Sequence, residues 1–366
     1  MKIVFLVGGG RAGSDFFHSL IDGHSQIIQF PGYLRVDKKL PLVLNSKTSN
    51  EIVKSFIKFY PEFFDSRKNK SERWEKLGNK KNKYFKIDTE KFKKNFIKIF
   101  DIKNNTKLDI IKKLHYAYFL TRNRKIEKKK ILFIHTHLLS WTKKFIKLTN
   151  LKNFEILHTI RHPLASLSSP LNAWLNYQEG RHFFSKDLHY QIDTVVNCIY
   201  DLNSLGKVRI IQLERLHTEN TKVMKNFCKN FKIKYEKCLK ISTKNGLKWW
   251  GDIYSQKYLS GINKKFKIKI NENYFKKNDL VYFQNLTKKI IKKYNYKFYY
   301  PNRNVLFNVQ PMKCEMLVWK NTFKYCFYKG FRWKHILSIP IFYMIRILKF
   351  NAIFVNSRKN NLPKAF

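Results

Sequence analysis

The most constraining feature of the sequence lies at its start, in the stretch VFLVGGGRAGSDFFHSLIDGH, Val4–His24. A run of apolar residues leads into a glycine cluster, and an amphipathic helical pattern follows the glycines. This order is typical of a buried β-strand, a tight turn and a helix. The N–H groups and the dipole at the start of a helix favour an anion, by about 0.3–1 kcal/mol for the dipole contribution. The stretch therefore predicts an α/β fold that binds a phosphate-bearing compound in this turn.

The turn fits the dinucleotide-binding pattern GxGxxG only in part. Gly8, Gly10 and Gly13 have the required spacing after an expected strand. That pattern also needs an acid near the end of the second strand, where it holds a ribose hydroxyl. Pro31 and Gly32 stand there instead. A Rossmann-type NAD(P) oxidoreductase therefore remains an alternative that rests on the three glycines alone.

The turn also lacks two residues that a nucleoside-triphosphate P-loop requires. Ser14 and Asp15 follow the last glycine, where a lysine and then a serine or threonine should stand, so the phosphate clamp and the magnesium ligand are both missing. What remains is a glycine turn with one cation, Arg11, whose planar guanidinium suits phosphate or sulfate oxygens. A simple strand-to-helix turn with a solvated arginine is the other interpretation.

Strand and helix patterns alternate along most of the chain. Apolar strand patterns recur at ILFIHTH, FEILHTI and KVRIIQLERL, and a helical pattern follows each of them. Such alternation predicts a doubly wound, mostly parallel sheet with a P-loop-like anion-binding loop after its first strand. Pro170, within PLASLSSPLNAWL, should interrupt or begin the helix there. We expect one α/β domain over residues 1–310, with a helical insertion at 49–130 and a basic, aromatic-rich extension at 311–366.

Composition limits the partners of the chain. Among 366 residues, 74 Lys and Arg stand against 25 Asp and Glu, a formal net charge of +49 that favours anionic partners. Because the lysines are spread rather than clustered, we expect no specific nucleic acid partner. The five cysteines show no disulfide or metal-binding spacing, and no signal peptide or span of ~20 apolar residues is visible. We therefore expect a cytoplasmic protein.

The first stretch resembles the 5′-phosphosulfate loop of sulfotransferases that use 3′-phosphoadenosine 5′-phosphosulfate (PAPS). In that family a loop of the form PRSGTT or KSGTT runs into a helix that ends in LDSHP, and GGGRAGSDFFHSLIDGHS is similar to both parts. The resemblance implies that the 5′-phosphosulfate is held by Gly10, Arg11, Ala12, Gly13, Ser14 and Asp15. Asp15 replaces the usual hydroxyl, and an acid repels a polyanion. Asp15 should therefore turn away as a cap or weaken the binding of PAPS.

Two later stretches resemble further parts of the same cofactor site. TIRHPLASLSS places Ser169 eight residues after Arg161, and the family holds the 3′-phosphate of PAPS with an arginine and a serine at that spacing. An ordinary surface arginine is the alternative. STKNGLKWWGD resembles the loop that closes over the nucleotide, so Lys244 and Gly246 are implied as contacts of the cofactor. Glu214, at the end of the strand pattern in KVRIIQLERL, is interpreted as structural.

The segment IHTHLL resembles the KTHLP segment of cytosolic sulfotransferases, whose histidine is the general base, and His137 takes that position. A base for this reaction should titrate near neutrality, as histidine does. His135 lies two residues before it, so both side chains point to one face of the strand. Other branches of the family use a glutamate soon after the first helix, but SQIIQFPGYL contains no acid. A structural role for the histidines, or half of a metal site with no third ligand, remains an alternative, and we expect no metal.

The resemblance implies in-line transfer of a sulfuryl group from PAPS to a hydroxyl or amine of an acceptor, with Arg11 and His137 as the catalytic residues. A bacterial carbohydrate-type sulfotransferase acting on a glycan or a lipid-linked glycan is the expected member of the family. A basic protein that binds polyanions without catalysis, or a member that has lost activity, is the alternative.

The extension can also hold the protein at an anionic inner membrane face. The basic and aromatic residues expected to do so are Lys324, Lys329, Arg332, Trp333 and Lys334. Packing of the extension on the core or on a second subunit is the alternative.

Overall fold

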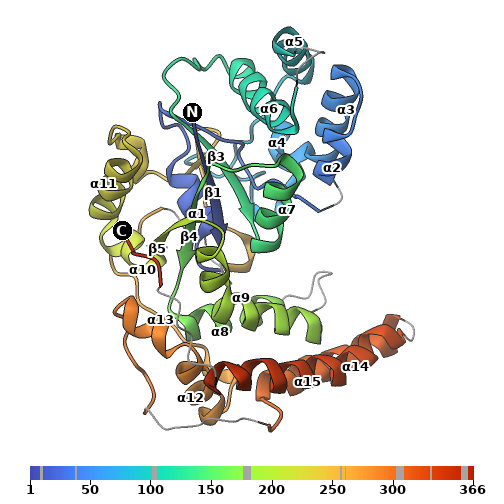
Figure 1. Ribbon diagram of the computed structural model, residues 1–366, viewed down its shortest axis with the longest axis vertical. Coiled ribbons are helices and arrows are strands. Elements are labelled where there is room, and N and C mark those ends of the chain that lie inside the picture. The colour runs from blue at the N-terminus through green and yellow to red at the C-terminus, as the bar shows by residue number, and fades with distance from the viewer. Residues whose placement is uncertain are drawn as a thin grey trace.

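A five-stranded, all-parallel sheet lies at the centre of the protein in this computed structural model (Figure 1). The structure describes residues 1–8, 11–37, 39–100, 105–175, 183–255, 258–259, 261–301, 309–329, 332–355 and 362–366. In spatial order the strands are β2 (Ile27–Ile28), β3 (Ile131–His137), β1 (Lys2–Gly8), β4 (Glu155–Ile160) and β5 (Lys207–Gln212). The predicted α/β fold with a parallel, doubly wound sheet is confirmed.

Helices cover both faces of the sheet. Along β1, Phe5 and Val7 enter one hydrophobic cluster, while Val4 and Leu6 enter the cluster on the opposite face. A strand buried on both faces reads as a continuous apolar run, as this one does. The helices that follow the strands are α1 (Ser14–Leu20), α7 (Leu139–Thr149), α8 (Pro163–Leu175), α9 (Ser185–Asn203), α10 (Leu213–Thr218) and α11 (Asn220–Phe231).

Helix α8 continues through Pro170, so the prediction that this proline interrupts or begins a helix is wrong. A proline has no N–H to donate to the carbonyl four residues before it. That carbonyl, of Ser166, instead accepts a hydrogen bond from Gln191 Nε2 of α9 at 3.4 Å. The tertiary contact thus supplies the donor that the helix lacks.

The segment 49–130 contains several helices in its described residues. After α2 (Lys39–Leu44) it contains α3 (Ser49–Phe59), α4 (Pro61–Phe64), the 3₁₀ turns η1 (Ser66–Lys68) and η2 (Lys70–Glu72), α5 (Thr89–Ile99) and α6 (Lys107–Thr121). A capping box of Thr48 and Glu51 begins α3. Phe56, Phe92 and Tyr118 join the same cluster as Phe5 of the sheet. The segment therefore shares the core of the sheet.

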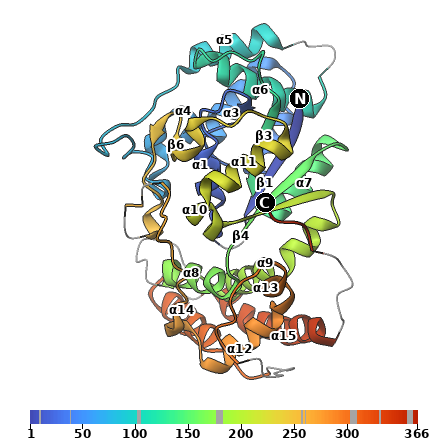
Figure 2. The ribbon, with the colours of Figure 1, turned by 90° about the vertical axis from the view of Figure 1, so that its left-hand side faces the viewer.

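The last third of the chain forms a small hairpin beside α1 and, from residue 277 on, helices that form a layer below the sheet (Figure 2). Its elements are the 3₁₀ turns η3 (Lys237–Lys240), η4 (Ile253–Ser255) and η5 (Glu272–Tyr274), the hairpin of β6 (Thr243–Lys244) and β7 (Leu247–Lys248), and the helices α12 (Lys277–Leu286), α13 (Lys288–Lys293), α14 (Lys313–Lys329) and α15 (Trp333–Val355). A buried ion pair, Arg346 Nε to Glu315 Oε1 at 3.0 Å, joins α15 to α14. None of the helices in the described ranges is both long enough and apolar enough to cross a bilayer.

The end of the chain returns to the sheet. Phe366 N–H donates to the Ile210 carbonyl at 3.0 Å, and Ile210 N–H donates to the Lys364 carbonyl at 3.2 Å. The Phe366 ring packs in the cluster on the α11 face. The extension predicted for residues 311–366 is thus attached to the core at its far end.

Candidate active site

The carboxyl ends of the parallel strands bring the predicted residues to one edge of the sheet. Arg11, Ser14 and Asp15 follow β1, His135 and His137 end β3, and Arg161 follows β4. In doubly wound sheets, ligands bind at this edge. The structure thus brings together residues from distant parts of the chain: Arg11, for example, contacts Ser169, 158 positions away.

The turn after β1 has a conformation that requires glycine. Gly13 has a φ of +83°, and a Cβ placed there would lie 2.4 Å from Leu213 Cδ1. A Cβ at Gly8 would lie 2.6 Å from Ser14 Oγ. The buried Ala12 lies inside the same turn. Gly10 lies outside the described residues.

Arg11 links the first and second predicted motifs directly. Its Nε donates to Ser169 Oγ of α8 at 3.3 Å. Its Nη2 also pairs with Asp252 Oδ2 at 3.0 Å. The arginine predicted for the 5′-phosphosulfate and the serine predicted for the 3′-phosphate therefore touch each other. Asp252, which the sequence patterns did not single out, holds the Arg11 guanidinium next to Ser169.

Arg161 carries a buried donor that pairs with nothing in the described structure. Its Nε and the Thr159 Oγ1 are both buried and lack a hydrogen-bond partner among the described residues. Both residues line a small cavity, together with His158, Pro163 and Ser166. Burial lowers the pKa of the Arg161 guanidinium. The buried, unpaired groups of Arg161 and Thr159, with Arg11 nearby, form a place where an anion would be held.

Glu214 lies close to Arg161 but plays a structural part. The prediction that it ends a strand is wrong, since β5 ends at Gln212 and Glu214 lies in the first turn of α10. Its Oε1 accepts the His162 N–H at 2.8 Å, and its Oε2 accepts the Tyr296 hydroxyl at 3.0 Å. The carboxyl group thus fixes the turn that carries Arg161.

The two histidines of β3 both face α1. Between β1 and β3 the pairing shifts by one residue, and His137 has a φ of +64° at the end of the strand. His137 Nδ1 lies 3.3 Å from Ser14 Oγ, and its ring stacks on Tyr33 at 5.2 Å between centroids. The side chain of His137 is 38% exposed, whereas that of His135 is fully buried. His137 is therefore the one that an acceptor can reach.

Asp15 points at both histidines, and so it neither caps its helix nor turns away. Its Oδ1 lies 3.8 Å from His135 Nδ1, and its Oδ2 lies 3.8 Å from His137 Nδ1. Burial by itself raises the pKa of Asp15, but the two histidines, Lys244 and Arg11 outweigh it and hold the pKa below its ordinary value. Asp15 is the third potential metal ligand that the sequence analysis did not find near the histidine pair.

The β6–β7 hairpin reaches the site from the opposite direction. Lys244 is buried, and its Nζ donates to the Pro31 carbonyl at 3.1 Å and lies 3.3 Å from His18 Nδ1. Burial lowers the pKa of Lys244, while the charge of Asp15 opposes the shift. Gly246 N–H donates to Asp22 Oδ2 at 2.7 Å, so this N–H is already engaged.

Glu72 is a residue of this site that sequence reasoning missed. It comes from η2, and its Oε2 is buried with no partner among the described residues. Trp249 Nε1 donates to the Glu72 carbonyl at 2.7 Å and holds the turn against the hairpin. Burial, together with the charges of Asp15 and Asp252, raises the pKa of Glu72 well above its ordinary value. The sequence analysis favoured His137 as the base because no acid follows the first helix. Glu72, which comes from η2, is a second candidate base.

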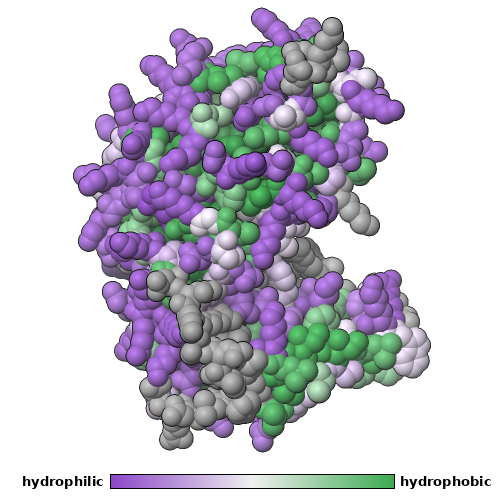
Figure 3. Space-filling model, in the orientation of Figure 1, coloured by the Kyte–Doolittle hydropathy of each residue, from purple (hydrophilic) through white to green (hydrophobic). Residues whose placement is uncertain are grey.

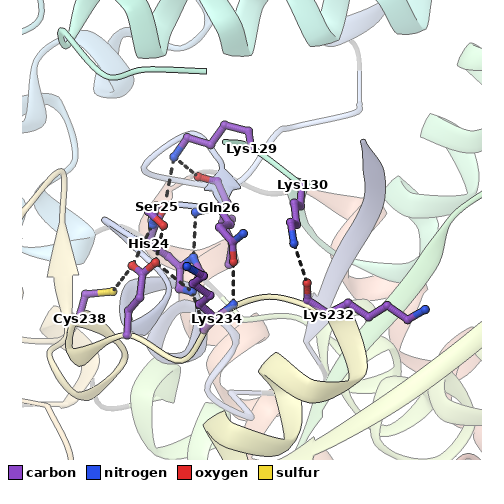
Figure 4. A network of polar contacts seen from close by, with 10 residues as sticks. His24, Ser25, Gln26, Lys129, Lys130, Lys232, Lys234 and Cys238 are labelled. Atoms are coloured by element: carbon purple, nitrogen blue, oxygen red, sulfur yellow. Dashed lines mark hydrogen bonds and ion pairs between the residues drawn. The ribbon is translucent and has the colours of Figure 1, made fainter. Parts of the chain in front are cut away.

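The far end of the first motif, LIDGHS, helps to hold the fold together (Figure 4). His24 Nε2 donates to the Lys234 carbonyl at 2.8 Å, and His24 Nδ1 accepts the Gln26 N–H at 3.1 Å. Lys129 Nζ donates to the His24 carbonyl at 3.2 Å. These contacts lie at the amino ends of β2 and β3, away from the predicted site, and they give His24 a structural part.

Comparison with known proteins gives only distant similarities. No family model matches the sequence, and no curated protein matches it. Among solved structures, a sulfotransferase domain from the Synechococcus PCC 7002 olefin synthase has a TM-score of 0.45 and 14% identity over 81% of this chain and 96% of that one. A sulfotransferase domain from the curacin biosynthetic pathway has a TM-score of 0.39 and 13% identity over 90% of this chain and 98% of that one. Because both are so distant, the proposal below rests on the residues of the site.

Proposed function

We propose that this protein is a PAPS-dependent sulfotransferase that transfers a sulfuryl group to an acceptor hydroxyl or amine. The observation that carries the proposal is the contact between Arg11 Nε and Ser169 Oγ at 3.3 Å, beside the buried, unpaired Nε of Arg161. The loops after β1 and β4 and the helix α8 thus present two guanidinium groups and a hydroxyl at one place. A nucleotide with phosphate groups at both its 3′ and 5′ positions matches such a pair of cationic anchors.

The described residues fit this cofactor. Arg161 and Ser169 would hold its 3′-phosphate, and Arg11 with the N–H groups of the glycine turn would hold its 5′-phosphosulfate. When bound, PAPS supplies the sulfuryl group and a phosphate leaving group. Arg11 would stabilise the charge that develops on that phosphate. Asp252 competes for Arg11 and would have to yield to the bound anion.

His137 is proposed to take the proton of the acceptor. If His137 Nδ1 donates to Ser14 Oγ, then Nε2 carries the lone pair that accepts a proton. The carboxylate of Asp15, 3.8 Å from Nδ1, would stabilise the imidazolium that forms. Glu72 is the rival base, because its raised pKa brings a buried carboxyl group closer to neutrality.

The order of the strands disfavours the NAD(P) alternative. In a dinucleotide-binding fold the second strand lies beside the first, so that an acid at its end reaches the ribose. Here β3 lies between β1 and β2. No acid at the end of β2 could therefore take that part, and the three glycines alone give no reason to expect a nicotinamide cofactor.

For the acceptor we propose a glycan or a lipid-linked glycan. The support is the surface beside His137, where the Tyr33 ring stacks on the histidine and lies 5.9 Å from the Trp141 ring. Aromatic faces next to a base can hold the apolar face of a sugar ring while its hydroxyl reaches the base. A cytoplasmic location remains part of this proposal.

The test is calorimetric titration with adenosine 3′,5′-bisphosphate, 5′-AMP and NAD at moderate salt, in the presence of EDTA. We expect a clear preference for the bisphosphate in the wild type. Arg161→Ala should lose about tenfold to a hundredfold in affinity for it. Arg67→Ala removes the same charge from an exposed arginine outside the site and should leave the affinity unchanged. Equal, salt-sensitive binding of all three compounds would instead support a basic polyanion-binding protein.

A further inference from the structure

The arrangement of Asp15, His135 and His137 resembles a set of ligands around an absent ion. One donor atom from each residue lies within 4.8 Å of the other two. Two ligands at 2.0–2.1 Å from a tetrahedral metal ion lie about 3.4 Å apart. The observed 3.8 Å between Asp15 oxygens and histidine nitrogens is too long for a hydrogen bond and requires only a small adjustment to reach this spacing.

The state of His135 points independently to a ligand. The residue is 2% exposed, yet neither of its ring nitrogens has a hydrogen-bond partner among the described residues. A buried polar group without a partner destabilises the fold, and a bound ligand would remove that cost. A partnerless imidazole nitrogen that lies 3.8 Å from a carboxylate oxygen is one of a pair of donor atoms that metal ions bind together.

We propose that Asp15, His135 and His137 form a binding site for a divalent first-row transition metal, of the Fe²⁺ to Zn²⁺ series. Two imidazoles and one carboxylate suit these ions and leave further coordination positions open. The half-exposed His137 places those positions toward solvent. Coordination through His137 Nδ1 would keep the proton on Nε2, so the bound ion and the proposed base exclude each other. A filled site would therefore inhibit sulfuryl transfer.

The test is titration of the metal-stripped, full-length chain with Zn²⁺ by calorimetry, and with Co²⁺ by visible absorption. We expect one equivalent to bind, with Co²⁺ bands typical of four or five ligands. Asp15→Asn and His135→Gln should each weaken binding at least about tenfold. His335→Gln removes a histidine of α15 far along the chain and should have no effect. Circular dichroism establishes that each variant is folded. Asp15, whose side chain is 22% exposed, keeps the test valid if His135→Gln fails to fold.

Equal binding by the wild type and the folded Asp15→Asn variant would overturn the metal site, as would the lack of binding by the wild type. The proposed function stands apart from these results, because the bisphosphate titration is made in EDTA. If the bisphosphate does not bind but one Zn²⁺ does, the sulfotransferase proposal fails and the metal site remains.

A second inference rests on the outer face of α15. Trp333, Leu337, Ile341, Met344 and Leu348 are between 51% and 67% exposed and follow one another at spacings of three and four residues. Residues at these spacings form a stripe along one side of a helix. Figure 3 shows apolar residues gathered over the arm formed by α14 and α15. The opposite side of α15, with Phe350 and Arg346, is buried.

Charge around this stripe identifies the partner. Lys320, Lys324, Arg332 and Lys334 are exposed on the same arm. From residue 311 to 366 the sequence contains one acid, Glu315, and this acid is buried in the ion pair with Arg346. The exposed charge of the described arm is therefore positive throughout. An apolar stripe flanked by cations is typical of a helix that lies in the interface of an anionic bilayer.

We infer that the α14–α15 arm docks the protein on an anionic membrane surface. The test is co-sedimentation with vesicles of phosphatidylcholine alone and with 30% phosphatidylglycerol, a lipid fraction of about the anionic content that recruits basic helices. We expect binding to the anionic vesicles only, weakened at least about tenfold in the Leu337→Ser, Ile341→Ser double variant. Leu42→Ser, at a 56% exposed leucine of α2, is the matched control.

Unchanged binding by the double variant would overturn the membrane inference. So would a dimer in light scattering that the double variant dissociates, because the stripe would then be covered by a second copy. Neither result affects the titrations with bisphosphate or metal.

Discussion

His24, in the loop before β2, and His135, in β3, are both buried histidines, but they lie at opposite edges of the sheet. At the amino edge, both ring nitrogens of His24 have a backbone partner. At the carboxyl edge, neither nitrogen of His135 has a partner among the described residues. Glu155 repeats the first pattern at the amino edge, where it pairs with Lys2 at 2.9 Å and Arg209 at 3.2 Å. Arg161, at the carboxyl edge, likewise has a buried Nε without a partner among the described residues.

This difference separates stability from function within one sheet. Paired polar groups at the amino edge repay their burial and hold the strands in register. Unpaired groups at the carboxyl edge cost stability, and folding tolerates such a cost where a ligand completes the pairing. Substitutions of these polar side chains should therefore have opposite consequences: loss of stability at the amino edge, and loss of binding or chemistry at the carboxyl edge.

The largest expected effect lies at the carboxyl edge. His137→Gln should lower turnover from PAPS about 10²- to 10⁴-fold, because it removes the general base, and should leave bisphosphate affinity within about twofold. The measurement is release of the bisphosphate with any acceptor that the wild type uses, beside a calorimetric titration. If Glu72→Gln abolishes turnover and His137→Gln does not, Glu72 is the base.

Two glycines with a positive φ flank α1, one at each edge of the sheet, and replacing each with alanine compares the local packing there. Gly13→Ala, at the carboxyl edge, should lower the free energy of unfolding by about 2–5 kcal/mol, because a positive φ combines with a clash against Leu213. Gly23→Ala, at the amino edge, has a φ of +84° and open space around it, and should cost about 1–2 kcal/mol. Urea denaturation measures both. Equal costs would mean that the turn relaxes away from Leu213.

Loss of the ion pairs of Glu155 should be visible in stability alone. Glu155→Gln should cost about 1–2 kcal/mol of unfolding free energy, since its partners are partly exposed, and should not change bisphosphate affinity. Burial raises the pKa of Glu155, but hydrogen bonds from Lys2 and Arg209 lower it below the ordinary 4.5. The contribution is therefore complete above pH 4.5 and is lost as the pH falls through the lowered pKa. Denaturation of both proteins between pH 7 and pH 3 should show the difference shrinking on the acid side.

The smallest expected effect is a gain. Asp252→Asn removes the charge that holds Arg11, so bisphosphate affinity should rise about two- to fivefold. Calorimetry measures the change, with stability checked by thermal denaturation. A fall in affinity would show that Asp252 orients Arg11 for the anion. The view that Asp252 competes with the anion for Arg11 would then be wrong.

The first strand, the glycine turn and the helix after it could be predicted from sequence, because apolar runs and glycines act locally. The same holds for β3, for the two histidines on one of its faces, and for Arg161 after β4. The effect of Pro170 on its helix was predicted wrongly, because the donor that keeps the helix intact comes from Gln191, on another helix. Glu72 escaped for a similar reason, since it joins the site through a contact with Trp249, 177 residues away.

Local sequence patterns alone predict an alternating α/β chain whose strand ends carry cations, hydroxyl groups and histidines. Local periodicity and turn chemistry are sufficient for that much, because each depends on neighbours within a few residues. Only the tertiary structure decided that β3 lies between β1 and β2, that Arg11 meets Ser169, and that Asp15 faces the two histidines. These features depend on which segments pack side by side, and that choice is made by burial and pairing across the whole chain.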